Sequence, residues 1–68
     1  MKYANGKKVL IKSNLGELAK NLFMIDWEGK IMTIKHVYED INRYGMEEDR
    51  IDNYCGSLWS EETIECAI

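Results

Sequence analysis

The chain contains no proline, a single histidine and only two cysteines in 68 residues. A structural zinc site needs four nitrogen, sulfur or oxygen ligands, and His36 with Cys55 and Cys66, which form no Cys-x-x-Cys pair, does not supply such a set. Two cysteines are also too few for the disulfide scaffold of a small secreted protein, so we expect reduced thiols and a cytoplasmic location. The sequence therefore predicts a chain without a bound metal or cofactor.

Sequence motifs for catalysis and phosphate binding are also missing. The five glycines are dispersed and form no phosphate-binding loop. A calcium loop aligned with Gly56 at its sixth position would have Ile51 as its first ligand, and an isoleucine side chain cannot bind calcium. His36 has no serine or cysteine beside it in the sequence that it could activate as a nucleophile. We therefore expect no enzymatic activity.

Long apolar runs are absent as well. The longest uninterrupted run covers residues 22–25, whereas a membrane-spanning helix needs about 20 apolar residues. No apolar segment follows Met1 and Lys2 in the manner of an export signal. The hydrophobic fraction of 46% favours a folded chain, and without an internal repeat or linker we expect one domain over residues 1–68.

Local patterns in the first half predict strands and one helix. Asn5 and Gly6 predict a tight turn between strands at 2–4 and 8–12, because both central residues of such a turn need positive φ. Ser13 or Asn14 is placed to cap a helix with apolar positions at Leu15, Leu18, Ala19, Leu22 and Phe23. Residues 22–34 either continue this helix or form a hairpin of 23–26 and 31–34 around a glycine, and we favour the hairpin.

The second half shows a helical spacing followed by strand alternation. Ile34, Val37, Tyr38, Ile41 and Tyr44 predict a second helix that ends at Gly45. Residues 46–54 favour one more short helix, and residues 63–68 alternate as a strand whose even-numbered side chains face inward. The predicted fold is α+β, a small antiparallel sheet with N-terminal and central hairpins and a C-terminal strand, packed against one or two helices. Its predicted core includes Leu15, Leu18, Leu22, Ile34, Val37 and Ile41.

Charge is divided unevenly along the chain. Residues 1–35 have seven lysines against three acids, a net charge of +4, whereas residues 36–68 have two arginines against nine acids, a net charge of −7. Asymmetry of this kind indicates binding partners rather than a fold. Because the candidate DNA-reading helix at 33–44 carries as many acids as bases, we do not expect direct binding of nucleic acid.

The acidic half predicts a surface for binding protein. On a helix, Glu48 and Asp52 would stand about 6 Å apart, which is close to the spacing of phosphates along one DNA strand. Aromatic residues lie among these acids, and exposed aromatic side chains commonly anchor protein interfaces. We expect the partner to be a nucleic-acid-binding protein, contacted through Glu39, Asp40, Glu47, Glu48, Asp49, Asp52, Tyr54 and Trp59.

In its small size, acidic charge and lack of proline, the chain resembles the inhibitors that phages and mobile elements carry against host defence nucleases, the anti-CRISPR and antirestriction type. This resemblance implies a stoichiometric inhibitor that occupies the nucleic-acid groove of its target. Two alternatives stay open. One is a small DNA-binding regulator that uses the lysine-bearing half, and the other is a structural protein that works as a homo-oligomer.

Overall fold

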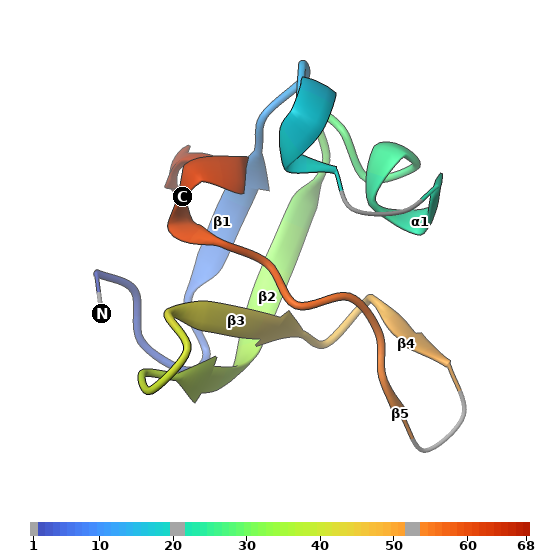
Figure 1. Ribbon diagram of the computed structural model, residues 1–68. Helices are drawn as coiled ribbons and strands as arrows, with labels where there is room; N and C mark the ends of the chain where they lie inside the picture. The colour runs from blue at the N-terminus through green and yellow to red at the C-terminus, as the bar shows by residue number, and fades with distance from the viewer. Residues whose placement is uncertain (1, 20–21, 52–53) are drawn as a thin grey trace.

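A computed structural model of the chain describes residues 2–19, 22–51 and 54–68. The described part forms short helical segments and antiparallel strands (Figure 1). The helical segments are the 3₁₀ turns η1 (Gly16–Leu18) and η2 (Glu61–Thr63) and the single-turn helix α1 (Leu22–Ile25). The strands are β1 (Lys8–Ile11), β2 (Ile31–Tyr38), β3 (Arg43–Met46), β4 (Arg50–Ile51), β5 (Tyr54–Cys55) and β6 (Ile64–Ala67).

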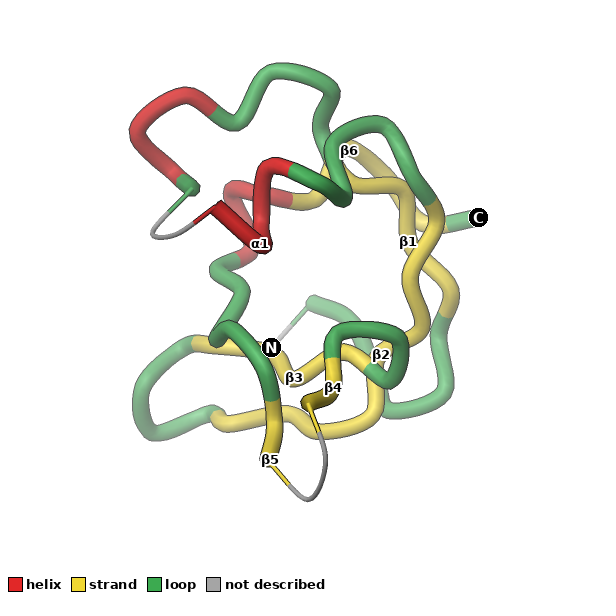
Figure 2. Tube along the Cα trace, turned by 90° about the vertical axis from the view of Figure 1, so that its right-hand side faces the viewer, coloured by secondary structure: helices red, strands yellow, loops and turns green. Residues whose placement is uncertain are grey.

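The main sheet has the strand order β3-β2-β1-β6, and every neighbouring pair is antiparallel. The long strand β2 pairs with a different neighbour along each half. Met32 and Thr33 pair with β1, whereas Val37 and Tyr38 pair with β3. The strands curve around the middle of the molecule, as the turned view of Figure 2 shows. Strands β4 and β5 form a separate pair that projects at the lower right of Figure 1. A small antiparallel sheet with few helical elements confirms the α+β class in outline.

The core lies inside this curved sheet. Strand alternation supplies most of it, because side chains at every second position of β1, β2 and β3 point to the same face. Leu15 and Met24 from the segment between β1 and β2 close one end. The buried hydrophobic residues are Val9, Ile11, Leu15, Met24, Met32, Ile34, Tyr44, Met46, Trp59 and Ile64.

The predicted N-terminal helix is wrong. Among the described residues of this region, η1 and α1 alone are helical, and Ala19 after η1 is extended, with φ −75° and ψ 113°. Helix α1 also replaces the first strand of the predicted central hairpin, whereas the second strand, at 31–34, is confirmed as part of β2. Leu22 is 79% exposed and therefore lies outside the core, although Leu18 packs against it.

The predicted helix over 34–44 is wrong as well, because these residues form β2, a turn and the start of β3. Ile41 lies in the turn and is exposed, and Asn42 beside it has a positive φ of 55°. Gly45 does not end a helix but lies buried in β3. A β-carbon there would stand 3.4 Å from the ring of Tyr38 and 3.5 Å from the β-carbon of His36.

The remaining predictions are confirmed in part. Asn5 and Gly6 do form a turn, with Gly6 at φ 90°, but residues 2–4 form no strand, and Gly6 donates its N–H to Ile34 across the sheet at 2.7 Å. The C-terminal strand is confirmed as β6, although Ile64 alone of its even-numbered residues is buried. The short helix predicted over 46–54 is wrong in the described part of that range, which holds the end of β3, a bend, β4 and the first residue of β5.

Candidate binding groove

The residues predicted to contact a partner do not all lie on the surface. Trp59 is completely buried, and Asp49 is only 5% exposed. The indole Nε1 of Trp59 donates to Oδ2 of Asp49 at 3.0 Å, and the N–H of Ser57 donates to the same oxygen at 2.7 Å. The bond between Asp49 and Trp59 joins the segment before β4 to the segment after β5. Neither side chain is available to contact a partner. Asp52 and the side chain of Tyr54 lie outside the described residues.

The other predicted acids are divided between the two ends of the β2–β3 hairpin. Glu39 and Asp40 are exposed in its turn, whereas Glu47 and Glu48 follow β3 at the opposite end. Glu48 accepts hydrogen bonds from the N–H and the hydroxyl of Thr33, at 2.7 and 2.9 Å. At about 3.3 Å per residue, the extended chain from Arg43 to Glu47 alone separates the two ends by about 13 Å. The acids therefore do not form one continuous surface.

A second surface is formed where two aromatic residues pair through their main chains. Tyr44 in β3 and Trp59 exchange two main-chain hydrogen bonds, of 2.7 and 2.8 Å, and both side chains are buried. Because side chains alternate along extended chain, the neighbours of this pair point outward. Arg43, Leu58 and Ser60 are thereby brought to one outer face.

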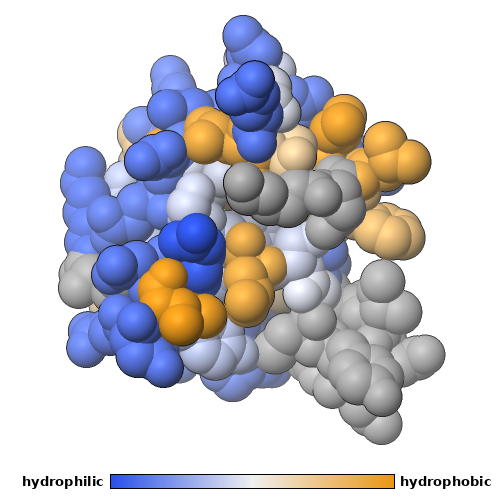
Figure 3. Space-filling view, viewed as in Figure 1, coloured by the Kyte–Doolittle hydropathy of each residue, from blue (hydrophilic) through white to orange (hydrophobic). Residues whose placement is uncertain are grey.

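This outer face contains two adjoining hollows, both open to solvent, that share Arg43, Ser60 and Glu62. Their volumes are about 590 and 150 Å³. We call the pair the binding groove. Figure 3, drawn from the viewpoint of Figure 1, shows hydrophobic and strongly hydrophilic side chains side by side near the middle of this face. The larger hollow is also lined by Lys2, Asn42 and Glu61, and the smaller one by Leu18 and Leu58.

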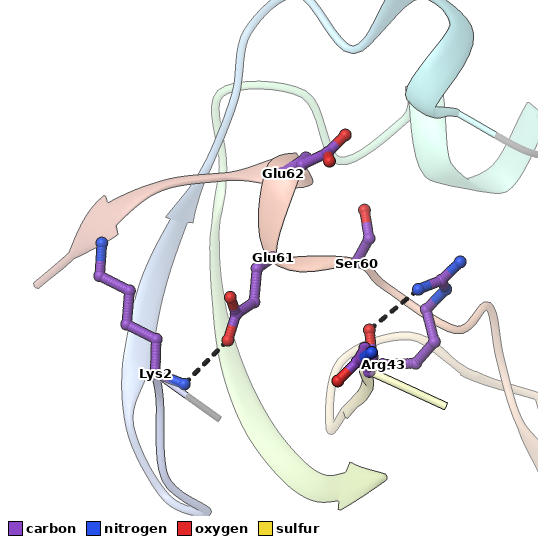
Figure 4. Close-up of a pocket in the computed structure, with 6 residues that line it drawn as sticks. Lys2, Arg43, Ser60, Glu61 and Glu62 are labelled. Carbon is purple, nitrogen blue, oxygen red and sulfur yellow. Dashed lines mark hydrogen bonds between the residues drawn. The ribbon is translucent and has the colours of Figure 1, made fainter. Parts of the chain in front are cut away.

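One wall of the groove is held by Glu61 at the start of η2. Its Oε1 accepts a hydrogen bond of 2.8 Å from the N–H of Lys2 (Figure 4). The same oxygen accepts a second bond of 2.8 Å from the hydroxyl of Tyr44. The Tyr44 hydroxyl in turn accepts from the N–H of Tyr3 at 3.1 Å. The Lys2 N–H, followed by the Tyr44 hydroxyl, lowers the pKa of Glu61, so its carboxylate stays charged. Burial is the main reason that the pKa of Tyr44 is raised.

The four charged side chains of the groove differ in the interactions that they already make within the protein. Nη1 of Arg43 donates to two main-chain carbonyls of the β2–β3 turn, at 3.2 and 2.9 Å. The ammonium of Lys2 lies 5.5 Å from the centre of the Tyr3 ring, and Glu61 accepts the two bonds described above. Within the described residues, the exposed carboxylate of Glu62 has no hydrogen bond or ion pair. The groove therefore offers a carboxylate without a partner among the described residues, next to the two leucines of the smaller hollow.

Sequence reasoning did not select the residues that line this groove. Arg43, Leu58 and Ser60 are ordinary surface residue types, and Glu62 is one acid among twelve. The sequence contains little signal here, because Leu58 and Trp59 are both apolar and do not alternate with polar residues as in a strand with one buried face. Leu58 is recognised as the outward residue only when the pairing of Trp59 with Tyr44 is known.

Within the described ranges, no three His, Cys, Asp or Glu side chains are grouped as metal ligands. No helix in those ranges has the length and apolar character needed to cross a membrane. Comparison of the chain with protein-family models, with curated proteins and with solved structures gave no match. Functional inference therefore depends on the groove itself.

Proposed function

We propose that the chain is a non-enzymatic protein-interaction domain and that the binding groove is its contact site. The observation that carries this proposal is the junction of the two hollows, where the carboxylate of Glu62, which has no hydrogen bond or ion pair among the described residues, adjoins a hollow lined by Leu18 and Leu58 as well as by polar side chains. Apolar side chains next to charged groups are the usual composition of a protein interface. Leu58 is 43% exposed, so its side chain is available to a partner.

Charge supports a basic partner. The chain has a net charge of −3, and Glu39 and Asp40 lie exposed in the turn that carries Asn42 and Arg43 of the groove. A surface with this balance attracts positively charged proteins over long range, especially at low ionic strength. A nucleic-acid-binding protein, the partner predicted from the sequence, presents such a basic surface, and inhibition of a defence nuclease stays a prediction about that partner.

Peptide selection tests whether the groove binds protein segments. A library of random peptides would be displayed and selected on the immobilised full chain, and the enriched peptides would be titrated into ¹⁵N-labelled protein. We expect the largest amide shifts at Arg43, Leu58, Ser60 and Glu62. The variant Leu58→Asp should weaken binding at least about tenfold, because it replaces one of the two leucines of the smaller hollow by a charged side chain.

The matched control is Leu22→Asp, which adds the same charge to an exposed leucine of α1, a helix that contributes no residue to the groove. Its affinity should stay within about twofold of the starting protein, as expected for a substitution away from the interface. If no peptide is enriched, if the shifts map to other elements, or if both variants bind equally well, the groove is not a protein-binding site.

A further inference from the structure

We infer that the groove recognises an extended peptide segment in which a basic side chain and an aliphatic side chain stand two residues apart. This inference deepens the proposed function and rests on it. It names the chemistry of the partner segment, which the function proposal leaves open.

The spacing follows from the floor of the groove. Leu58 and Ser60 are two residues apart and point to the same outer face, because Trp59 between them is buried and bonded on both sides to Tyr44. Two residues of extended chain advance about 7 Å. A peptide that lies extended along this floor has the same repeat, so its side chains at i and i+2 face Leu58 and Ser60 in turn. The groove therefore matches alternate residues of a strand-like ligand.

The aliphatic position is set by the two leucines of the smaller hollow. Leu18 from η1 and Leu58 both line it, and its volume of about 150 Å³ is that of a single side-chain site rather than of a ligand cavity. An aliphatic side chain placed there removes its own apolar surface and that of both leucines from water. The hollow therefore selects an aliphatic residue.

The basic position is set by Glu62 at the junction of the hollows, which Arg43 and Ser60 also line. Of the charged groups in the groove, Glu62 is the one without an interaction in the described part of the chain, whereas Arg43 and Lys2 are both engaged. Figure 4 shows Lys2 next to Glu61, Arg43 across from them below Ser60, and the carboxylate of Glu62 above Ser60, pointing away from Arg43. A lysine or arginine of the peptide at this point gains a carboxylate partner without displacing an existing one.

Four capped seven-residue peptides test the inference by NMR titration of the labelled full chain. The reference peptide is Thr-Thr-Lys-Thr-Leu-Thr-Thr, acetylated and amidated. The others replace its Lys by Glu, replace its Leu by Ala, or place Lys and Leu next to each other. We expect the reference peptide to bind about fivefold or more tightly than each of the other three, and its affinity to fall as salt is added.

Reversal of the charge at Glu62 provides the sharpest comparison. In Glu62→Lys the preference should invert, so that the peptide with Glu in place of Lys binds more tightly than the reference. The control Glu65→Lys makes the same charge change at an exposed residue of β6 that does not line the groove, and it should keep the original preference. Circular dichroism of both variants checks that they remain folded.

The outcomes separate this inference from the proposed function. If selected peptides bind the groove but favour acidic residues, or bind equally well with Lys and Leu adjacent, the partner chemistry is wrong and the groove remains a binding site. If the peptide preference does not change in Glu62→Lys, Glu62 does not contact the basic residue. If neither selected nor designed peptides perturb the amides of the groove, both proposals are wrong.

Discussion

The buried hydrogen bond between Trp59 and Asp49 should contribute strongly to stability. The carboxylate accepts the indole N–H of Trp59 at 3.0 Å and the N–H of Ser57 at 2.7 Å, in a site that is almost closed to water. Replacement Asp49→Ala leaves the indole donor buried without a partner, at a cost of about 1–3 kcal/mol. Loss of the second bond to a charged acceptor adds to this, so we expect a total of about 2–4 kcal/mol.

That loss is large for a chain of this size. At about 0.05–0.15 kcal/mol per residue, the whole fold is stable by roughly 3–10 kcal/mol. Each kcal/mol shifts Tm by about 4–8 °C in a domain of this length, so Asp49→Ala should lower Tm by at least about 8 °C. Asp49→Asn keeps an acceptor oxygen and should cost less. Urea denaturation followed by far-ultraviolet circular dichroism measures all three proteins.

A double-mutant cycle isolates the bond itself. Trp59→Phe removes the N–H donor and also leaves a small cavity, but the cavity is common to both arms of the cycle. We expect Asp49→Ala to cost about 1–2 kcal/mol less in the Trp59→Phe background than in the original protein. If the two substitutions add within about 0.5 kcal/mol, the bond does not stabilise the fold and the argument from burial is refuted.

Three further substitutions test other parts of the structure. Glu61→Gln should destabilise the protein at neutral pH but not in acid. Folding lowers the pKa of Glu61 from its ordinary value of 4.5, so the charged carboxylate stabilises the fold. This stabilisation is lost as the pH falls through the pKa of Glu61 in the folded protein. Glu65→Gln is the control for removing one charge, and Tm measured against pH compares the two. Ile34→Ala should cost about 2–5 kcal/mol in urea denaturation, whereas Leu22→Ala, at an exposed position, should change stability by less than about 0.5 kcal/mol. Gly56→Ala should lower Tm sharply, because a β-carbon there would overlap the carbonyl oxygen of Asp49, and an unchanged Tm would contradict this packing.

The parts of the fold that the sequence predicted correctly are those set by local chemistry. A turn formed at Asn5 and Gly6, in which Gly6 reaches a φ of 90° without strain, although the predicted hairpin did not form and Asn5 does not adopt positive φ. The strands at 8–11, 31–34 and 64–67 are short stretches rich in β-branched and other apolar residues, which favour extended chain. These local preferences can be recognised before the partner strands are known.

The false helix at 34–44 has a specific physical cause. The register of β2 against β3 shifts between Ile34 and His36, as at a β-bulge. An extra residue in a strand changes which face the following side chains point to. Met32 and Ile34 face the core two residues apart, but the next residue packed against the core is Val37, three positions later. This spacing of three imitates the period of a helix, and it can be recognised as a strand only once the partner strand is known.

The binding groove could not be predicted for a related reason. Arg43 and Ser60 meet because Tyr44 pairs with Trp59, a contact between residues far apart in the chain. The intervening segment holds the β4–β5 hairpin, whose base is fixed by the bond from Gly56 N–H to the Asp49 carbonyl at 2.8 Å. No local pattern reports such a pairing.

The acids of the second half have two different roles. Some accept hydrogen bonds within the fold, whereas Glu62 is available to a ligand. Asp49 accepts from a buried indole, Glu48 accepts from a neighbouring strand, and Glu61 holds the N-terminal segment. Each of these carboxylates satisfies donors within the fold, where an ionised acceptor forms a stronger bond than a neutral one. A net charge counted from sequence treats them in the same way as Glu62, which faces the groove without such a bond. Replacing the internal acceptors should therefore reduce stability, whereas replacing Glu62 should leave stability nearly unchanged and alter the choice of ligand, so the two roles of the acids are separable by experiment.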